Sequence, residues 1–600
     1  MARRAAIVCA VLSAACGGPA PAGKVSASIA LLTNGQLAVV NGDQGSVSLL
    51  DAKTLAVQKT IDVGGRPHAL LQLQSGALWV TTHTGGNLVE IDVAAGVASA
   101  PMFVCPGSAG LAESHDGSFV AIACEWSGQV MRVDPKTKAA TVLASGLARP
   151  RAVATVGSAV IAADFPGEQV HVFDSAKSAT VSLVPSAAPY RPALTKMTAN
   201  LAEAVVPAFG HLFVAHELVN HTGDDSEEKI SDDYGNVLDG ASKINAAVTR
   251  LELDGQSVAN ENATPPTYSR FDATPHAVSG PVALASFGSK YLLVANVSTN
   301  DVAMIDSEAT DQAKRLVATW AVGAGPSGIA VDEASAVAYV DNAFDGSISV
   351  LDLTAAHDAT APLHQPTQTL VRSLVNPFSA TALAGRKLFY DASNPHVTPS
   401  RVVACATCHP GGGDDGLIWF MHTGKIPLKR RRTPHLANAN STTAPFHWDG
   451  QFATMTDLVN ATVTDLMAGD DLLVDATTVQ AFVDEIVEKP EAPAQDAAAV
   501  QRGQAIFDQA GCGTCHSDPS LTDNLLHAVL TPESLMSDDA FTTANTPALH
   551  GLFMRAPFFH DGRSKDLRDL LTRSDAAMHT GTTSLTASQL DDLVVYLESL

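Results

Sequence analysis

Residues 405–409 read Cys-Ala-Thr-Cys-His and residues 512–516 read Cys-Gly-Thr-Cys-His, and these two runs decide the organisation of the chain. The paired thiols are Cys405 and Cys408 in the first run and Cys512 and Cys515 in the second. His409 and His516 follow directly. The C-x-x-C-H pattern is the attachment signature of c-type haem. Two thiols at this spacing form thioethers to one porphyrin, and the adjacent histidine becomes the proximal iron ligand. The sequence therefore predicts two covalently attached c-type haems.

Two other readings of the cysteine pairs remain. A zinc site needs four ligands in tetrahedral geometry, which the two pairs together could supply. A thioredoxin-like redox pair needs a neighbouring βαβ pattern, which neither run has. Neither reading requires histidine directly after the second cysteine in both runs, so the haem interpretation is favoured.

Length and charge bound the class of protein. Six hundred residues exceed the size of a single hydrophobic core and predict more than one domain. The formal net charge of −25 argues against nucleic acid as a partner and permits steering of a basic protein.

The N-terminus has the pattern of an export signal. Arg3 and Arg4 precede an apolar stretch at 5–12 and small residues at 13–15, and the stretch is too short to span a membrane. Cys16 follows as the acceptor of a bacterial lipoprotein signal, although Ser13 stands where lipoproteins more often have leucine. The alternative is cleavage near 20–22 without lipidation. We expect a signal peptide at 1–16, a location in the periplasm or cell envelope, and membrane contact only through a lipid anchor on Cys16.

Cys105 and Cys124 remain after the signal and haem cysteines are assigned. In an oxidising compartment they predict a disulfide within one structural unit, the alternative being two buried free thiols.

Residues 25–353 repeat one pattern: an apolar strand, a polar turn, and a second alternating strand that ends in Asp. The instances are Gln36–Asp51, Ala77–Asp92, Phe119–Asp134, Ala159–Asp174, His211–Asp254, Tyr291–Asp306 and Val337–Asp352. The terminal Asp residues step by 41, 42 and 40 positions from Asp51 to Asp174, which is typical of propeller blades. The region resembles seven-bladed propellers of the YVTN-repeat type, an architecture that hosts many functions.

Two further features belong to this region, and a third segment follows it. Arginine-containing segments at 65–68 and 148–151 connect one repeat unit to the next. We interpret these connecting residues as structural or surface residues. An acidic insertion at 220–246 interrupts the fifth unit, where a solvated loop is favoured over a cation site. Residues 354–377 carry no period and are interpreted as a linker.

The haem runs lie in two copies of one unit, at 378–488 and 496–600. Each copy has a helix before the haem, a Thr-Pro after it, a Phe-rich segment ending in Asp-Gly, a methionine, and a closing helix. Thr586 and Gln589 form a capping box that starts the last helix. The predicted fold class is multidomain: an all-β seven-bladed propeller followed by a mainly α di-haem cytochrome c region.

These shared motifs resemble the bacterial di-haem cytochrome c peroxidase family, which includes the MauG-like enzymes. The resemblance implies that the second haem stores electrons with His516 and Met578 as ligands. It implies that the first haem, on His409, reacts with hydrogen peroxide, with His422 as the displaceable distal ligand. Trp448 matches the family's tryptophan between the haems. A small cytochrome c or cupredoxin is the expected electron donor.

Two positions depart from the family pattern. The distal acid falls at Leu466, with Asp465 one step away as the proton donor that we predict. The asparagine of the family's calcium site falls at Arg432, which leaves calcium doubtful.

The sixth ligands stay open from the sequence. Met467 either packs in the core or ligates the first haem, and His579 competes with Met578 at the second. Peroxide reduction is the favoured function. If Met467 closes the first haem, a non-enzymatic electron carrier docked by its propeller is the alternative. A MauG-like oxidation of another protein is disfavoured, because that behaviour goes with tyrosine where this chain has Met578.

Overall fold

The computed structural model describes residues 22–174, 178–183, 198–221, 244–254, 257–259, 278–309, 315–355, 364–421, 429–438, 441–470, 474–528, 543–573, 579 and 582–600. The export signal, His422 and Met578 lie outside these residues, as do the acidic residues at 224–233 of the insertion.

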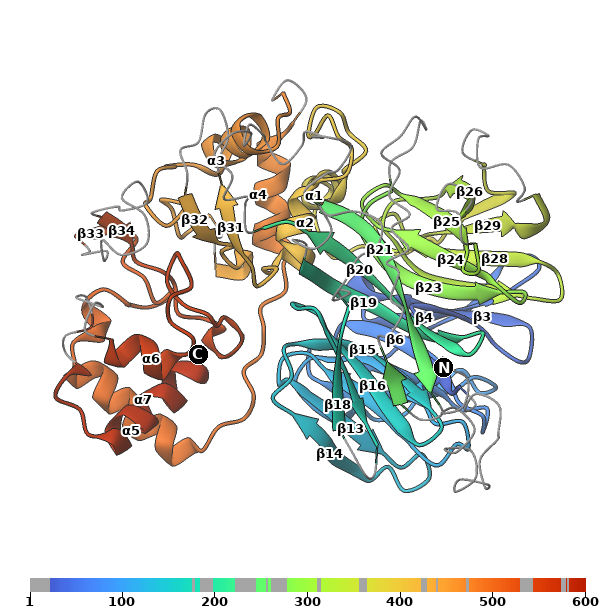
Figure 1. The fold of residues 1–600 in the computed structure, drawn as a ribbon, viewed down its shortest axis with the longest axis horizontal. Coiled ribbons are helices and arrows are strands. Elements are labelled where there is room, and N and C mark those ends of the chain that lie inside the picture. The colour runs from blue at the N-terminus through green and yellow to red at the C-terminus, as the bar shows by residue number, and fades with distance from the viewer. Residues whose placement is uncertain are drawn as a thin grey trace, which may run out of the picture.

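Seven antiparallel sheets form the blades of a propeller in the N-terminal half of the molecule (Figure 1), which confirms the predicted architecture. The blades in chain order are β2–β5 (Ile29–Leu31, Gln36–Asn41, Ser46–Asp51, Val57–Asp62), β6–β10 (Pro67–Gln72, Leu78–Thr82, Asn87–Asp92, Val97–Ala98, Met102–Phe103), β11–β14 (Ser108–Glu113, Val120–Cys124, Gln129–Val133, Ala140–Ser145), β15–β18 (Pro150–Val156, Ala159–Asp164, Gln169–Phe173, Ser178–Ser182), β19–β22 (Thr198–Ala208, His211–Val219, Ile244–Asp254, Ser257–Ala259), β23–β26 (Pro281–Phe287, Tyr291–Asn296, Asp301–Asp306, Leu316–Ala321) and β27–β30 (Pro326–Asp332, Val337–Asn342, Ser347–Asp352, Gln368–Val371). The short strand β1 (Lys24–Val25) adds to the edge of the third blade through β11.

The repeated Asp marks the end of the third strand of a blade. Asp51 accepts hydrogen bonds from the backbone N–H groups of Lys53 and Thr54, and Asp134 does the same with Lys136 and Thr137. An Asp side chain that bonds the backbone two residues on stabilises a turn. The period read from the sequence is therefore the period of these turns.

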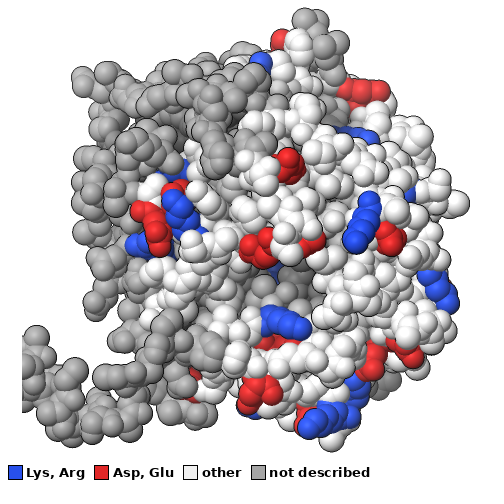
Figure 2. Space-filling view, turned by 90° about the vertical axis from the view of Figure 1, so that its right-hand side faces the viewer, with Lys and Arg blue, Asp and Glu red and all other residues white. Residues whose placement is uncertain are grey.

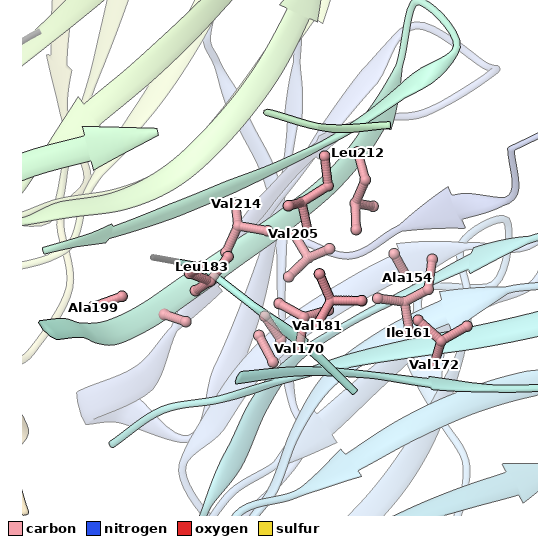
Figure 3. Close-up of a cluster of buried hydrophobic side chains, with 14 of the residues drawn as sticks. Ala154, Ile161, Val170, Val172, Val181, Leu183, Ala199, Val205, Leu212 and Val214 are labelled. Atoms are coloured by element: carbon pink, nitrogen blue, oxygen red, sulfur yellow. The ribbon is translucent and has the colours of Figure 1, made fainter. Parts of the chain in front are cut away.

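Neighbouring blades pack face to face through small and branched side chains. Ala154, Ile161 and Val172 of the fourth blade lie against Val205 and Leu212 of the fifth in one buried cluster (Figure 3). A sheet with period-two alternation must bury one face against a neighbour, and the ring of blades does this for each sheet in turn.

One predicted boundary is wrong. Residues 354–377 are not a linker throughout, because β30 pairs with β29 and completes the seventh blade. The predicted disulfide is present: Cys105 and Cys124 are joined within the third blade, with Cα atoms 5.9 Å apart.

The fifth blade has the longest strands and reaches the C-terminal half (Figure 1). Val219 at the end of β20 and Ile244 at the start of β21 share a buried cluster with Val402, Trp419 and Met467. A propeller hairpin therefore forms part of the wall around the first C-x-x-C-H copy.

Two copies of one helical unit make up the C-terminal half. The first contains α1 (Ala380–Tyr390), α2 (Cys405–Cys408), α3 (Met455–Ala461), a π-helical turn (Thr462–Leu466) and α4 (Ala476–Glu485), with the hairpin β31–β32 (Ile418–Met421, Lys429–Arg432). The second contains α5 (Ala497–Gln509), α6 (Leu567–Thr572) and α7 (Ala587–Glu598), with the hairpin β33–β34 (Leu526–Ala528, Thr543–Asn545). The predicted capping box of Thr586 and Gln589 starts α7.

A glycine allows the first and last helices of each copy to cross closely. A Cβ on Gly385 of α1 would lie 1.8 Å from the carbonyl oxygen of Thr478 in α4. A Cβ on Gly503 of α5 would lie 2.1 Å from the carbonyl oxygen of Asp592 in α7. Both contacts are to backbone, so the helices would have to separate to accept a side chain.

The charged side chains on the propeller face turned away from the C-terminal copies are mixed in sign and scattered (Figure 2). Among the described helices, none combines the length and hydropathy needed to span a bilayer.

Gly503→Ala tests the helix crossing. We expect a loss of roughly 1–3 kcal/mol of unfolding free energy, because overpacking outweighs the gain of about 1 kcal/mol in helix propensity. The measurement is chemical denaturation followed by helical circular dichroism. The control Gln504→Ala changes an exposed position of the same helix and should stay within about 0.5 kcal/mol. Equal stability of the two variants would contradict the close crossing.

Candidate functional site

The two C-x-x-C-H runs have the same local geometry. Nδ1 of His409 lies 3.1 Å from the carbonyl oxygen of Gly413, and Nδ1 of His516 lies 3.1 Å from that of Leu521. A hydrogen bond from Nδ1–H to a carbonyl fixes the ring and leaves Nε2 for a metal. The four cysteines of the runs form no disulfide. Each run thus offers two thiols and one oriented imidazole, which fits a covalently bound haem.

The zinc alternative is not supported. Among the described residues, the group of cysteine, histidine and carboxylate side chains close enough to share a metal is Cys515, Asp523 and His527. That group contains one haem-attachment cysteine, and His527 already pairs with Asp523 at 2.7 Å. The two cysteine pairs do not combine into a four-thiolate site.

A cavity of about 270 Å³ lies beside the second run. Its wall is apolar, with Leu549, Leu552, Leu571, Leu593 and Leu597 among the lining residues. Its polar edge contains His516, His579, Trp448 and the arginines 432 and 555. An apolar pocket with a few polar groups is the environment in which a porphyrin is held and its carboxylates are bound.

His579 lies in this cavity with His516. Burial, followed by the charge of His516, lowers the pKa of His579 to about 4, so the imidazole is neutral near pH 7. Its Nδ1 is buried and has no hydrogen-bond partner among the described residues. A neutral imidazole without a partner is suited to bind a metal. The sequence left this position open between His579 and Met578, and Met578 lies outside the described residues.

The first copy is arranged differently. Met467 is 3% exposed and packs in the cluster that includes Val219 and Trp419, with Cys408 against it. Asp465 is half-buried in the π-helical turn, where its carboxylate accepts a hydrogen bond of 2.9 Å from the Thr464 hydroxyl. Met467 thus belongs to an apolar cluster against which Cys408 of the first run packs. His422 lies outside the described residues.

Trp448 lies where the two copies meet. It belongs to the first copy but lines the cavity of the second, with its ring centroid 6.4 Å from that of His560. Its indole N–H donates to the carbonyl oxygen of Arg432 at 3.0 Å. Trp448 therefore lies between the two C-x-x-C-H copies, and its role between haems stays a prediction.

Two reciprocal backbone hydrogen bonds join the copies. The N–H of Arg432 donates to the carbonyl of His560 at 2.6 Å, and the N–H of Asn545 donates to the carbonyl of Trp448 at 2.9 Å. Arg432 ends β32 and Asn545 ends β34, so the last residue of the equivalent strand in each copy bonds the other copy. The copies form a pseudo-two-fold pair within one chain.

Sequence reasoning missed two buried carboxyl groups near the first run. Burial raises the pKa of Glu217 to about 8, helped by Asp415 and Glu203, and burial raises the pKa of Asp415 to about 7. After burial, Asp415 and Glu217 are the main causes that raise the pKa of the Cys408 thiol. Glu217 comes from propeller strand β20. It could have been predicted only by knowing that the fifth blade contacts the first copy.

Of the two interpretations of the arginines at 148–151, the structural one is confirmed, because Arg149 is buried, Arg151 is half-buried and both form ion pairs. Glu125 accepts hydrogen bonds from Arg149 and Arg151 and pairs with His83. Arg149 also donates to the carbonyl of Asp414. Asp414 lies in the loop that follows His409 of the first haem run. His83, Glu125 and Arg151 line a cavity of about 720 Å³ between the propeller and the first copy.

The comparisons with known proteins agree with this site. Residues 379–510 match the family model of di-haem cytochrome c peroxidase, and residues 500–600 match that of cytochrome c. The methylamine utilization protein MauG of Methylorubrum extorquens is 27% identical over 285 residues, covering 38% of this chain and 79% of that protein. MauG of Methylophilus methylotrophus is 24% identical over 287 residues, covering 38% and 84%.

Among solved structures, a chain of hydrazine synthase from Kuenenia stuttgartiensis is 17% identical over 56% of this chain and 95% of its own, with a TM-score of 0.44. The family matches and the site together describe a MauG-like di-haem cytochrome region with two covalently bound c-type haems, fused to a seven-bladed propeller.

His83 predicts a pH dependence of the contact between the propeller and the first copy. Burial alone would lower the pKa of His83, but Glu488 and Glu125 raise it to about 9, from 6.5 when unfolded. A raised histidine pKa stabilises the fold fully below pH 6.5, and this contribution is lost as the pH rises through 9. It amounts to about 3 kcal/mol.

We expect His83→Gln to remove this part of the pH dependence when thermal unfolding is compared at pH 6.5 and 9.5. His115→Gln, which changes an exposed histidine of the same propeller, is the control and should keep the wild-type slope. An unchanged slope in His83→Gln would show that the imidazole is not held protonated between Glu125 and Glu488.

Proposed function

We propose that this chain is an exported di-haem peroxidase that reduces hydrogen peroxide to water with electrons from a small redox protein. The supporting observation is the junction of the copies: Trp448 is anchored to Arg432 of the first copy and lines the cavity of the second. A residue so placed connects two redox sites that have different surroundings. The reaction consumes one peroxide, two electrons and two protons and yields two waters.

The proximal ligands are His409 and His516, each held by a backbone carbonyl. When bound, c-type haem supplies one-electron chemistry at its iron. On this proposal the second copy stores an electron, and the first copy binds peroxide with His422 as the displaceable ligand. Asp465 is the proton donor predicted from the sequence. Glu217, with a pKa near 8, is a second acid suited to release a proton near neutral pH.

His579, rather than Met578, is our choice for the sixth ligand of the second haem. It shares a cavity with His516, its imidazole is neutral, and its Nδ1 has no partner among the described residues. Two imidazole ligands close the iron to peroxide, which suits an electron-storing site.

A second function has its own support. Met467 is buried in an apolar cluster against which Cys408 packs, so a thioether sulfur lies in the neighbourhood of the first haem run. If that sulfur ligates the first iron, both sites are closed and the protein is an electron carrier docked by its propeller.

The cellular setting follows from the sequence. The export pattern and the Cys105–Cys124 disulfide support a location outside the cytoplasm. We place the protein in the periplasm or cell envelope, anchored through Cys16, with a small cytochrome c or cupredoxin as donor.

Peroxide turnover separates the two functions. We expect the matured, half-reduced protein to oxidise a reduced small cytochrome continuously when peroxide is added, measured by absorbance. Trp448→Phe should slow this turnover several-fold, because the variant loses the bond to Arg432 and the indole between the sites. Trp320→Phe, a buried change in the propeller, should leave it unchanged. Absence of turnover in the wild-type protein would favour the electron carrier.

Spectroscopy of variants tests the ligand at the second haem. We expect Met578→Leu to leave the second haem low-spin and His579→Gly to make it high-spin, because the glycine variant loses the imidazole. Added imidazole should restore the low-spin state of His579→Gly. Conversion to high-spin in Met578→Leu alone would assign the ligand to methionine.

A further inference from the structure

Two buried guanidinium groups point to a feature of the junction that the family matches do not describe. Arg432 is 2% exposed and Arg555 is 9% exposed, and both line the cavity beside His516. The Nε of each is buried and has no hydrogen-bond partner among the described residues. Nη1 of Arg555 donates to backbone carbonyls, at 2.9 Å to the oxygen of Ala548 and at 3.5 Å to that of His550.

Carboxylate groups at this place are too few for the cations. Asp414 lies 3.4 Å from Arg432 and 3.8 Å from Arg149. Arg149 is already paired with Glu125 at 3.2 Å. Asp414 contacts Arg432 directly and acts on Arg555 only through its charge. Burial and the neighbouring charge of Arg432 lower the pKa of Arg555 to about 10. The junction therefore carries an excess of buried positive charge.

A buried cation without a counter-charge is costly, and guanidinium groups pair well with carboxylates. A haem attached to Cys512 and Cys515, which line this cavity, would carry two propionate carboxylates that these arginines could bind. Arg563, the third arginine that lines the cavity, already has a carboxylate partner. It is paired with Asp561 at 2.9 Å and lies over the ring of Phe559.

We propose that Arg432 and Arg555 bind the propionate groups of the second haem and supply there the positive charge that a bound divalent cation would otherwise provide. The inference rests on the haem-binding part of the proposed function and not on peroxide turnover. The two copies differ at this point, since the residue equivalent to Arg432 is the uncharged Asn545. The added charge therefore acts at one face of the pseudo-symmetric junction.

The charge has a redox consequence. A positive group near a haem stabilises the ferrous form, which carries one positive charge fewer than the ferric form. Coulomb's law at a protein dielectric makes one charge at about 10 Å worth roughly a tenfold change in this equilibrium. Arg432 and Arg555 thus raise the midpoint potential of the second haem, as an electron store requires.

Redox titration of the matured, full-length protein tests the inference. We expect Arg432→Gln and Arg555→Gln each to shift the ferric–ferrous equilibrium of the second haem about tenfold toward ferric, or about 59 mV. Arg431→Gln makes the same charge change one residue earlier in β32, outside the cavity lining, and should cause no comparable shift. Calcium or a chelator should leave the wild-type potential unchanged.

Equal potentials in Arg432→Gln, Arg555→Gln and Arg431→Gln would overturn the proposal, as would a wild-type potential that depends on calcium. If Arg432→Gln does not mature with both haems, Arg432→Lys and Arg555→Gln serve in its place. The lysine variant should keep most of the wild-type potential because it keeps the charge. The midpoint potentials can be measured even in a protein that does not turn over peroxide. Failure of the peroxidase proposal and failure of the propionate proposal can therefore be distinguished.

Discussion

Two backbone hydrogen bonds, from Arg432 to His560 and from Asn545 to Trp448, are the constraint on which the C-terminal site depends. Each begins at the last residue of a strand that directly precedes a Thr-Pro segment, so each copy fixes the other's loop. The exchange places Trp448 at the second cavity and Arg432 between the copies. The two backbone bonds are equivalent, so the backbone of the junction is symmetric. The side chains at their ends differ, because one bond joins Arg432 to His560 and the other joins Asn545 to Trp448.

The propeller contributes more than a scaffold to this site. Its fifth blade supplies Val219 and Ile244 to the cluster beside the first haem run, and Arg149 donates to the carbonyl of Asp414 in the loop after His409. Ion pairs this deeply buried are specific, because breaking one leaves an unpaired charge. The same contact brings Glu217, an acid from the propeller and not from the cytochrome sequence, to the first copy.

Local chemistry made much of the structure predictable. The blade period could be predicted because an Asp ends the third strand of each blade with a turn. The haem sites could be predicted because the porphyrin sets the spacing of the thiols and the imidazole. The capping box of α7 and the Cys105–Cys124 pair were also predictable from neighbouring residues. Strand β30 was missed because its four residues, Gln368–Val371, have no alternation of their own. Glu217 and the pairing of Arg149 with Asp414 were missed because they depend on residues brought together from distant parts of the chain.

The central claim is that one haem site is open to peroxide and the other is closed by protein ligands. Magnetic circular dichroism of the matured, half-reduced protein tests it most directly, because it observes the ferric and the ferrous haem together when peroxide or cyanide is added. The account predicts that only the haem on His409 changes its coordination, while the haem on His516 keeps a low-spin signal set by protein ligands. Two low-spin signals that both ignore the added ligand would contradict it.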